Sequence, residues 1–325
     1  MNKIDRSVLR FVIVLVGLSL ALWMAGKYIY YPYADTQDRM RGLLRKAPQL
    51  EAVTFGNSEN MALDFKELGL NGHHAWMNGS DIFETKYLVE NLLPRLPAVQ
   101  TVFIAVPYFE FSLDNAAYTA DDRTDIKKGM YASLPLDRPM KGDNKNFIFA
   151  KVLAPVVRTD HWETALQQII RGKRIENTVD EYGNLVTTQI IKSKEDMDLR
   201  VANNKHGHIA FARKMLFDHK NLQQDAFEEM KILLKLLKAR NIRVVFFTPP
   251  LYCQFTQGYD KLIVSDMKSR MNTISREFGV EYYDYSEDRE IADNYAYFWD
   301  ETHLNNEGAR LFTKKFKKGM LKAEK

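Results

Sequence analysis

Residues 51–58 read Glu-Ala-Val-Thr-Phe-Gly-Asn-Ser, and this stretch predicts how the fold begins. The first five residues have the apolar character of a short buried strand, and Gly56 ends it. Apolar residues then recur with helix-compatible spacing from Met61 to Leu68. A buried strand that leads directly into a helix is the expected first unit of a chain that alternates strands with helices.

The same alternation continues along much of the chain. Strand-like apolar runs and amphipathic helical patterns follow one another, and they predict a parallel α/β sheet with helices on both faces. The expected strands are Ala75–Met77, Val99–Val106, Ile242–Phe247 and Val280–Tyr283, and the expected helices are Ile82–Leu93, Leu222–Arg240, Tyr259–Phe278 and Asn305–Met320.

Residues 110–220 interrupt this regularity. The segment is polar, mixed in charge and poor in periodicity, although Phe147–Val157 and Thr164–Ile170 have helical patterns. We interpret it as an insertion above the C-terminal edge of the sheet, where α/β enzymes place their specificity elements.

The N-terminus has the pattern of a membrane segment. Lys3, Arg6 and Arg10 precede sixteen uncharged residues, Phe11–Gly26, and Lys27 follows them. As a helix, these residues would extend roughly 24 Å, somewhat less than the roughly 30 Å hydrocarbon core of a bilayer. Four tyrosines between positions 28 and 33 suit the headgroup region and make up the difference.

The basic residues before this segment favour a cytoplasmic N-terminus. The remaining chain would then face outward, in the periplasm or at the cell surface. A cleaved secretory signal is the competing interpretation, but no small-x-small cleavage site closes the apolar run. We therefore expect a cytoplasmic N-terminus and transmembrane anchor over residues 1–33 and an extracytoplasmic domain over residues 34–325.

Composition restricts the classes of partner. The single Cys253 permits no internal disulfide, so an ordinary hydrophobic core must stabilise the domain. The formal charge is +4, and residues 310–325 carry seven basic side chains against one glutamate. A solvated helix face explains this cluster most simply, and contact with an anionic lipid or polymer is the alternative. We expect no nucleic-acid partner outside the cytoplasm.

Two short motifs point to nucleophilic catalysis. Gly56-Asn57-Ser58 follows the first strand, and Asp300-Glu301-Thr302-His303 lies near the C-terminus. A serine hydroxyl is a poor nucleophile at neutral pH unless an imidazole takes its proton and a carboxylate orients the imidazole. Asp300 can reach Nδ1 of His303 from the same turn, which leaves Nε2 for Ser58. The alternative is that Ser58 is only a helix N-cap, with Asn60 as a second candidate.

These motifs resemble the first and last sequence blocks of the SGNH hydrolase superfamily, over about residues 50–108 and 222–320. The resemblance implies a flavodoxin-like parallel sheet, with Ser58 as the nucleophile, His303 as its base and Asp300 as the acid that orients the base. Gly79, after Asn78, matches the second block, so the backbone N–H groups of Ser58 and Gly79 would form the oxyanion hole. Where the family's esterases have an asparagine in the third block, this chain has Pro107-Tyr108-Phe109-Glu110.

The membrane segment, the altered third block and the sequence Thr248-Pro249-Pro250-Leu251 narrow the resemblance to the membrane-anchored DltD-like branch, which includes polysaccharide O-acetylation factors. This branch implies acyl transfer, O-acetyl or D-alanyl, onto a polysaccharide or teichoic-acid-like polymer of the cell envelope. It implies a multi-pass membrane-bound O-acyltransferase as partner and no cofactor. An esterase or deacetylase of such polymers, or a degenerate domain that only binds a polymer or partner, remains an alternative.

The remaining candidates concern binding. Asn57, Asn78 and Tyr108 are possible substrate-binding residues, because they lie beside the expected cleft; Phe109 and Phe111 share this position, although core packing is the more frequent use of aromatic rings. His206 and His208 could ligate a metal, but no helpful Cys or carboxylate spacing accompanies them, so we expect no metal site. His73 and His74 are expected in a loop or at the sheet edge.

Overall fold

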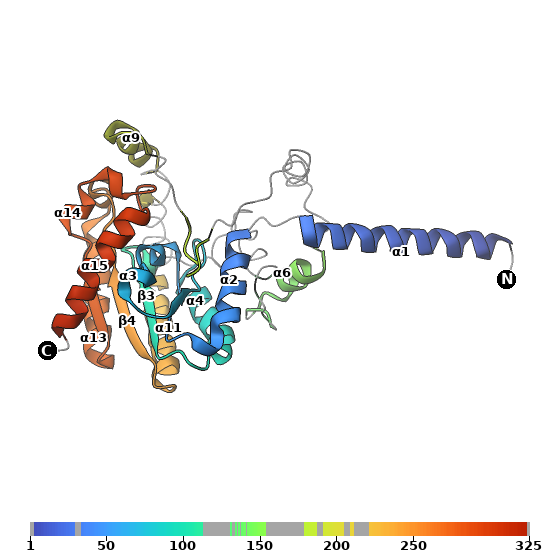
Figure 1. Ribbon diagram of the computed structural model, residues 1–325, viewed down its shortest axis with the longest axis horizontal. Helices are drawn as coiled ribbons and strands as arrows, with labels where there is room; N and C mark the ends of the chain where they lie inside the picture. The colour runs from blue at the N-terminus through green and yellow to red at the C-terminus, as the bar shows by residue number, and fades with distance from the viewer. Residues whose placement is uncertain are drawn as a thin grey trace. The chain divides into compact units, whose positions relative to one another are not determined.

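The computed structural model describes residues 3–29, 34–112, 131, 134, 136, 138–140, 142–153, 179–186, 191–204, 209–210 and 221–323 (Figure 1). The chain divides into two compact units. The first comprises Met1–Gln37 and Thr119–Thr178, and the second comprises Asp38–Tyr118 and Val179–Lys325.

The second unit contains a five-stranded sheet in the order β2-β1-β3-β4-β5, in which every neighbouring pair is parallel. This is the strand order of flavodoxin-like folds, and the predicted α/β class is confirmed. The strands are β1 (Ala52–Thr54), β2 (Gly72–His74), β3 (Thr101–Ala105), β4 (Arg243–Thr248) and β5 (Glu281–Asp284).

Helices accompany the sheet in the expected order. Helix α15 packs on η2 and α3, and α11 packs on α4 and α13 (Figure 1). The principal helices are α3 (Phe65–Leu68), α4 (Ile82–Leu92), α11 (Leu222–Lys238), α13 (Lys261–Phe278) and α15 (Asn306–Ala323). Shorter elements are η1 (Ala47–Gln49), η2 (Ser58–Ala62), η3 (Leu93–Arg95), η4 (Glu110–Ser112), α12 (Cys253–Thr256), α14 (Arg289–Ala292) and η7 (Tyr295–Tyr297).

Burial explains the continuous apolar character of the central strands. All of β1 is buried, and in β3 and β4 only the first residue of each strand is not. A strand buried on both faces has no solvent side on which to place polar residues. The four long helices lie within a few residues of their predicted bounds, and Gly279 ends α13 with φ +57°.

Two local predictions need correction. The helix expected over Met61–Leu68 is a short 3-10 helix, η2, followed by the separate α3, which the Asp64 side chain caps at the Glu67 N–H, 3.1 Å away. The second strand lies at Gly72–His74 rather than Ala75–Met77, although backbone bonds from Ala75 N to Thr54 O and from Met77 N to Gly56 O continue its pairing with the β1 segment.

His73 and His74 therefore belong to the edge strand β2, and both are buried. Nδ1 of His73 donates to the His74 carbonyl at 2.8 Å, and Nδ1 of His74 lies 3.0 Å from Thr54 Oγ1. Burial, with the nearby positive charges, lowers the pKa of His73 to about 4, and it lowers the pKa of His74 as well. Both imidazoles are therefore neutral in the folded protein at neutral pH.

Lowering the pH below about 6.5 should reduce the free energy of unfolding through His73. The unfolded chain binds a proton at His73 near pH 6.5, whereas the folded protein resists it down to about pH 4. The His73 contribution to stability is therefore complete above pH 6.5 and decreases by about 3 kcal/mol between pH 6.5 and pH 4, at 1.36 kcal/mol per pKa unit. We expect the difference in unfolding free energy between wild type and His73→Gln, measured in urea, to become smaller as the pH falls from 6.5 to 4. A difference that does not vary with pH would contradict the buried neutral imidazole.

The first unit contains the N-terminal helix α1 (Lys3–Ile29) and the start of α2 (Ala34–Lys46). It also contains α6 (Asn144–Ile148) and a π-helical turn, η5 (Phe149–Leu153). Within the part of the chain that the structure describes, no helix combines the length and hydropathy needed to cross a membrane. The span predicted at Phe11–Gly26 continues into residues 22–26, whose side chains are outside the described set, so the anchor stays a prediction.

Three described segments from residues 110–220 belong to the second unit and contact its other elements: residues 110–112, 179–186 and 194–204. Element η4 packs on α11, and residues 179–186 form a tight turn with an antiparallel bridge between Val179 and Leu185. The turn joins the edge strand through the bond from His74 N to Tyr182 O at 2.8 Å. Helix α9 (Lys194–Asn204) contacts α12. The helical pattern at Thr164–Ile170, together with His206 and His208, lies outside the described residues.

Candidate active site

The turn that carries Ser58 follows directly from the end of β1. Gly56 has φ +120°, a conformation that L side chains rarely adopt, and an added Cβ there would lie 2.8 Å from Asn60 Nδ2. Asn57 is extended and occupies the N-cap of η2 without a side-chain capping bond. Ser58 is the first residue of this 3-10 helix, so the interpretation of Ser58 as the N-cap is wrong.

Two buried side chains hold this turn in place. Asn60 Nδ2 donates to the Asn57 carbonyl at 3.0 Å, and Asn60 Oδ1 accepts from the Ala105 N–H at 3.0 Å. Asn57 Nδ2 donates to Glu110 Oε2 at 2.8 Å. The turn is therefore fixed to the end of β3 and to η4. Asn57 is itself buried, and its Oδ1 has no hydrogen-bond partner among the described residues, so the predicted contact of Asn57 with substrate stays a prediction.

The C-terminal motif forms a compact turn before α15. Asp300 Oδ1 accepts from the backbone N–H groups of Thr302 and His303 at 2.9 and 2.8 Å. A bridge between Phe298 and Leu304 closes the turn. Asn305 Oδ1 then accepts from the N–H groups of Glu307 and Gly308 at 3.1 and 3.0 Å, which starts α15.

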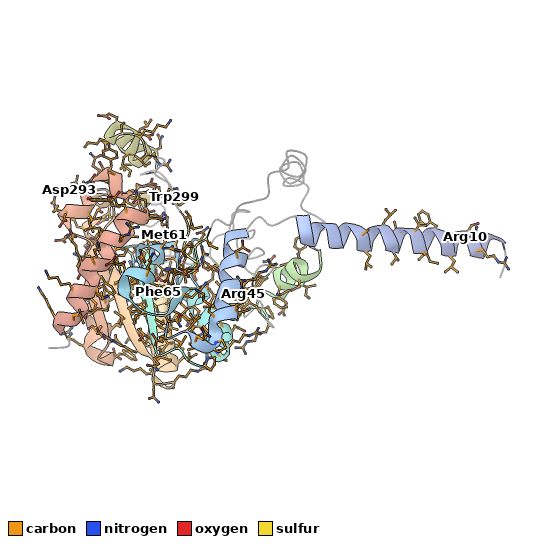
Figure 2. The ribbon with its side chains drawn as sticks, in the orientation of Figure 1. Arg10, Arg45, Met61, Phe65, Asp293 and Trp299 are labelled. Carbon is orange, nitrogen blue, oxygen red and sulfur yellow. The ribbon has the colours of Figure 1, made fainter. Side chains whose placement is uncertain are left out.

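The structure brings Ser58, His303 and Asp300 together as one hydrogen-bonded series. His303 Nε2 lies 2.7 Å from Ser58 Oγ, although 245 positions separate them. His303 Nδ1 lies 2.9 Å from both carboxylate oxygens of Asp300. Figure 2 places Met61 of η2 and Trp299, just before Asp300, at the same end of the sheet, as this bond requires. The three groups have the geometry of a nucleophile, a base and an orienting acid.

The charges around His303 favour its protonated form. Burial lowers the pKa of His303, but the charge and hydrogen bond of Asp300, with the charges of Glu59 and Glu301, raise it to about 9. Burial raises the pKa of Asp300, and its contacts with His303 and two backbone N–H groups hold the pKa well below the usual range. Asp300 is therefore ionised, and it stabilises the imidazolium that forms when His303 removes a proton from Ser58.

Further ionisable groups surround this series. Glu59 Oε1 lies 3.9 Å from His303 Nε2, and burial raises the pKa of Glu59. Glu301 is buried, and Arg200 of α9 lies 3.7 Å from it. Tyr259 is buried, and its hydroxyl makes no hydrogen bond within the described part of the chain; burial and the charges of Glu59 and Glu301 raise its pKa.

The other predicted site residues lie in loops at the carboxyl ends of the strands. Asn78 is exposed and Gly79 has φ +61°; both follow Met77, whose N–H bonds to the Gly56 carbonyl at 2.9 Å. Tyr108 is only 2% exposed, and its ring packs edge-on against Tyr259 at 6.0 Å. Tyr108 is therefore part of the loop packing beneath the site and does not present a ring surface to a sugar in this conformation.

The sequence alone does not indicate the contacts that Glu59, Asn60 and Glu110 make around the Ser58 turn. The sequence predicts Asn60 only as a candidate helix cap, whereas in the structure its side chain holds the Ser58 turn. Glu110 follows Pro107-Tyr108-Phe109, where the sequence predicts no partner for it, and it accepts a hydrogen bond from Asn57. The available signal was polar residues in otherwise buried surroundings, because buried polar groups need partners.

No protein-family model matches this chain, and neither does any curated protein. Over the described residues, no group of three or more His, Cys, Asp or Glu side chains is arranged to hold a metal ion. The chemistry is therefore inferred from the geometry around Ser58 and from the sequence motifs.

Proposed function

We propose that this chain is an SGNH-type acyl-transfer enzyme that forms a covalent ester on Ser58. The observation that carries the proposal is the 2.7 Å contact between Ser58 Oγ and His303 Nε2, with Asp300 on the other ring nitrogen. In such a series the neutral imidazole takes the serine proton and so converts the hydroxyl into a nucleophile. Its position at the carboxyl edge of a parallel sheet is where open α/β folds bind their substrates.

The proposed reaction has two steps. In the first, His303 Nε2 takes the Ser58 proton, Oγ bonds to the acyl carbon, and the donor's leaving group departs with that proton. In the second, His303 removes a proton from an acceptor hydroxyl, whose oxygen bonds to the acyl carbon. The bond to Oγ then breaks, and the proton returns from Nε2 to Ser58.

The developing oxyanion needs hydrogen-bond donors. The Ser58 N–H heads η2, where the first N–H groups of a helix have no intrahelical acceptor, and the Gly79 N–H is the second proposed donor. The third block offers no asparagine, because Phe109 stands at that position in Pro107-Tyr108-Phe109-Glu110. Loss of one oxyanion donor costs about 10²–10³ in rate. We therefore expect slow turnover on simple esters.

The proposed acceptor is an extracytoplasmic polysaccharide or teichoic-acid-like polymer, and the acyl group is acetyl or D-alanyl. The proposed location is the outer side of the cytoplasmic membrane, with the residues 11–26 as a single-pass anchor. The proposed donor system is a multi-pass membrane-bound O-acyltransferase. These finer points are supported by the N-terminal charge pattern and by the resemblance to the DltD-like branch.

The direction in which polymer acylation changes separates the candidate functions. We expect a producing strain whose only copy carries His303→Ala to have less ester on its envelope glycopolymer than the wild-type strain, measured as acyl groups released by mild base. A deacetylase would give more ester in the variant strain. A module that only binds the polymer or a partner would leave the ester content unchanged. Immunoblotting should show equal amounts of the two chains.

A further inference from the structure

The carboxylate of Glu59 lies beside the same imidazole nitrogen that Ser58 uses. Glu59 Oε1 is 3.9 Å from His303 Nε2, and Ser58 Oγ is 2.7 Å from it. Glu59 is 5% exposed and follows Ser58 directly in η2. A group that approaches Nε2 to react at Ser58 must therefore pass close to the Glu59 carboxylate.

Among the described residues, no side-chain hydrogen bond holds the Glu59 carboxylate, in contrast to its buried neighbours. Asp81 and Glu84 form the capping box of α4, and Glu110 binds Asn57. The carboxylate of Glu59 approaches one ionisable base among the described residues, His303, at a distance too long for a direct hydrogen bond. Burial of a carboxylate is unfavourable unless hydrogen bonds compensate for it. The carboxylate accepts a hydrogen bond from its own backbone N–H, and a substrate hydroxyl can donate a further one to the acceptor positions that remain.

Acylation of Ser58 would leave two hydrogen-bond acceptors facing the incoming nucleophile. Once Oγ belongs to an ester, Nε2 no longer receives its proton, and Nε2 and Glu59 Oε1 stand 3.9 Å apart. Two donors with hydrogen bonds of about 2.8 Å can reach both atoms at this separation, from one oxygen or from two adjacent oxygens. Water has two O–H groups on one oxygen, and a vicinal diol has them on two neighbouring oxygens. A monohydric alcohol supplies only one.

We propose that Glu59 selects the nucleophile of the second step, so that the acyl group passes to molecules with two adjacent donors, namely vicinal diols of sugars or polyols, and water. This inference rests on the proposed acyl-serine. The attacking hydroxyl gives its proton to Nε2 and its oxygen to the acyl carbon, the bond to Ser58 Oγ breaks, and Nε2 returns the proton to Oγ. Glu59 accepts a hydrogen bond from the second hydroxyl and exchanges no proton.

The test measures how one acyl-enzyme partitions between matched acceptors. The full chain is acylated with 4-nitrophenyl acetate in the presence of equal concentrations of 1,2-propanediol and 1-propanol, and both acetate esters are quantified by gas chromatography. We expect wild type to favour the diol by about tenfold or more, because the alcohol leaves Glu59 Oε1 without the hydrogen bond that the second hydroxyl of the diol donates. In Glu59→Leu, the ratio of diol ester to propanol ester should come close to the ratio of hydroxyl groups in the two acceptors. Glu59→Gln keeps one acceptor oxygen and should give an intermediate ratio.

This ratio does not depend on how fast Ser58 is acylated, because both products come from the same intermediate. Glu84→Gln is the matched control, since it alters another buried carboxyl group, keeps an acceptor for the capping box of α4 and should retain the wild-type ratio. If circular dichroism shows that Glu59→Leu does not fold, the ratio measured for Glu59→Gln is compared with the wild-type ratio instead. An acyl-serine with no diol preference, or a preference that survives both Glu59 substitutions, overturns this inference alone. A wild-type chain that forms no acyl-serine overturns the proposed function as well.

Discussion

His303→Ala is expected to lower kcat/KM for a small acetyl ester by about 10⁴-fold or more. Nε2 of this imidazole is 2.7 Å from Ser58 Oγ, and within the described structure it is the only neutral-base candidate that contacts the hydroxyl. Glu59, the nearest carboxylate to Nε2, is a far weaker base. Without His303, the Ser58 hydroxyl keeps its proton, and attack on the ester slows accordingly.

Stopped assays of 4-nitrophenol release by the purified chain would measure this loss. Circular dichroism and the thermal unfolding midpoint of the variant must match those of wild type, because His303 lies in a turn that packs before α15. Ser58→Ala should give a loss of similar size, and the double variant should be no slower than either single variant, because the two groups act as one unit. A His303→Ala enzyme with more than a tenth of wild-type activity would contradict the proposed base.

Asp300→Asn is expected to reduce kcat/KM by about 10³–10⁴-fold and to shift its pH dependence. An asparagine amide can donate to Nδ1, which would place the remaining ring proton on Nε2, where Ser58 needs an acceptor. The substitution also removes the largest influence that raises the pKa of His303. Burial then lowers this pKa, opposed only by Glu59 and Glu301.

The pH profile provides the test of this second prediction. Catalysis needs neutral His303, so wild-type kcat/KM should rise with pH through an inflection at the pKa of His303, about 9, and level off above it. In Asp300→Asn the inflection should move to lower pH. Thr302 Oγ1, 3.0 Å from Nδ1, remains as a weaker partner, so some orientation of the ring persists. An inflection that stays in place would show that Asp300 does not control the ionisation of His303.

The sequence predicted the alternation of strands and helices because apolar periodicity reports burial directly. Long helices such as Leu222–Lys238 and Lys261–Phe278 have one apolar face and clear ends. Short elements were less predictable. Strand β2 consists of a glycine and two histidines, a composition that does not predict a strand. Its position depends on backbone pairing with β1 and with the turn at Tyr182.

The series of Ser58, His303 and Asp300 was predictable because each motif supplies residue types that act together in nucleophilic catalysis. Asp300 and His303 meet within one turn, and a hydroxyl after a strand end lies at the carboxyl edge, so only their juxtaposition needed the fold. The supporting residues needed the structure itself. Asn60 contacts the end of β3, and Glu110 contacts Asn57 across more than fifty positions. Glu59 lies 3.9 Å from His303, which is distant from it in the sequence.

The most direct test of the account is the identity of the acylated residue. Wild-type chain is incubated with 4-nitrophenyl acetate, quenched in acid, and examined by intact mass and peptide fragmentation. We predict one acetyl adduct on Ser58, which is lost in Ser58→Ala and retained in Ser112→Ala, a matched substitution of another buried serine. An adduct that persists in Ser58→Ala, or that maps to another residue, would contradict the assignment of Ser58 as the nucleophile.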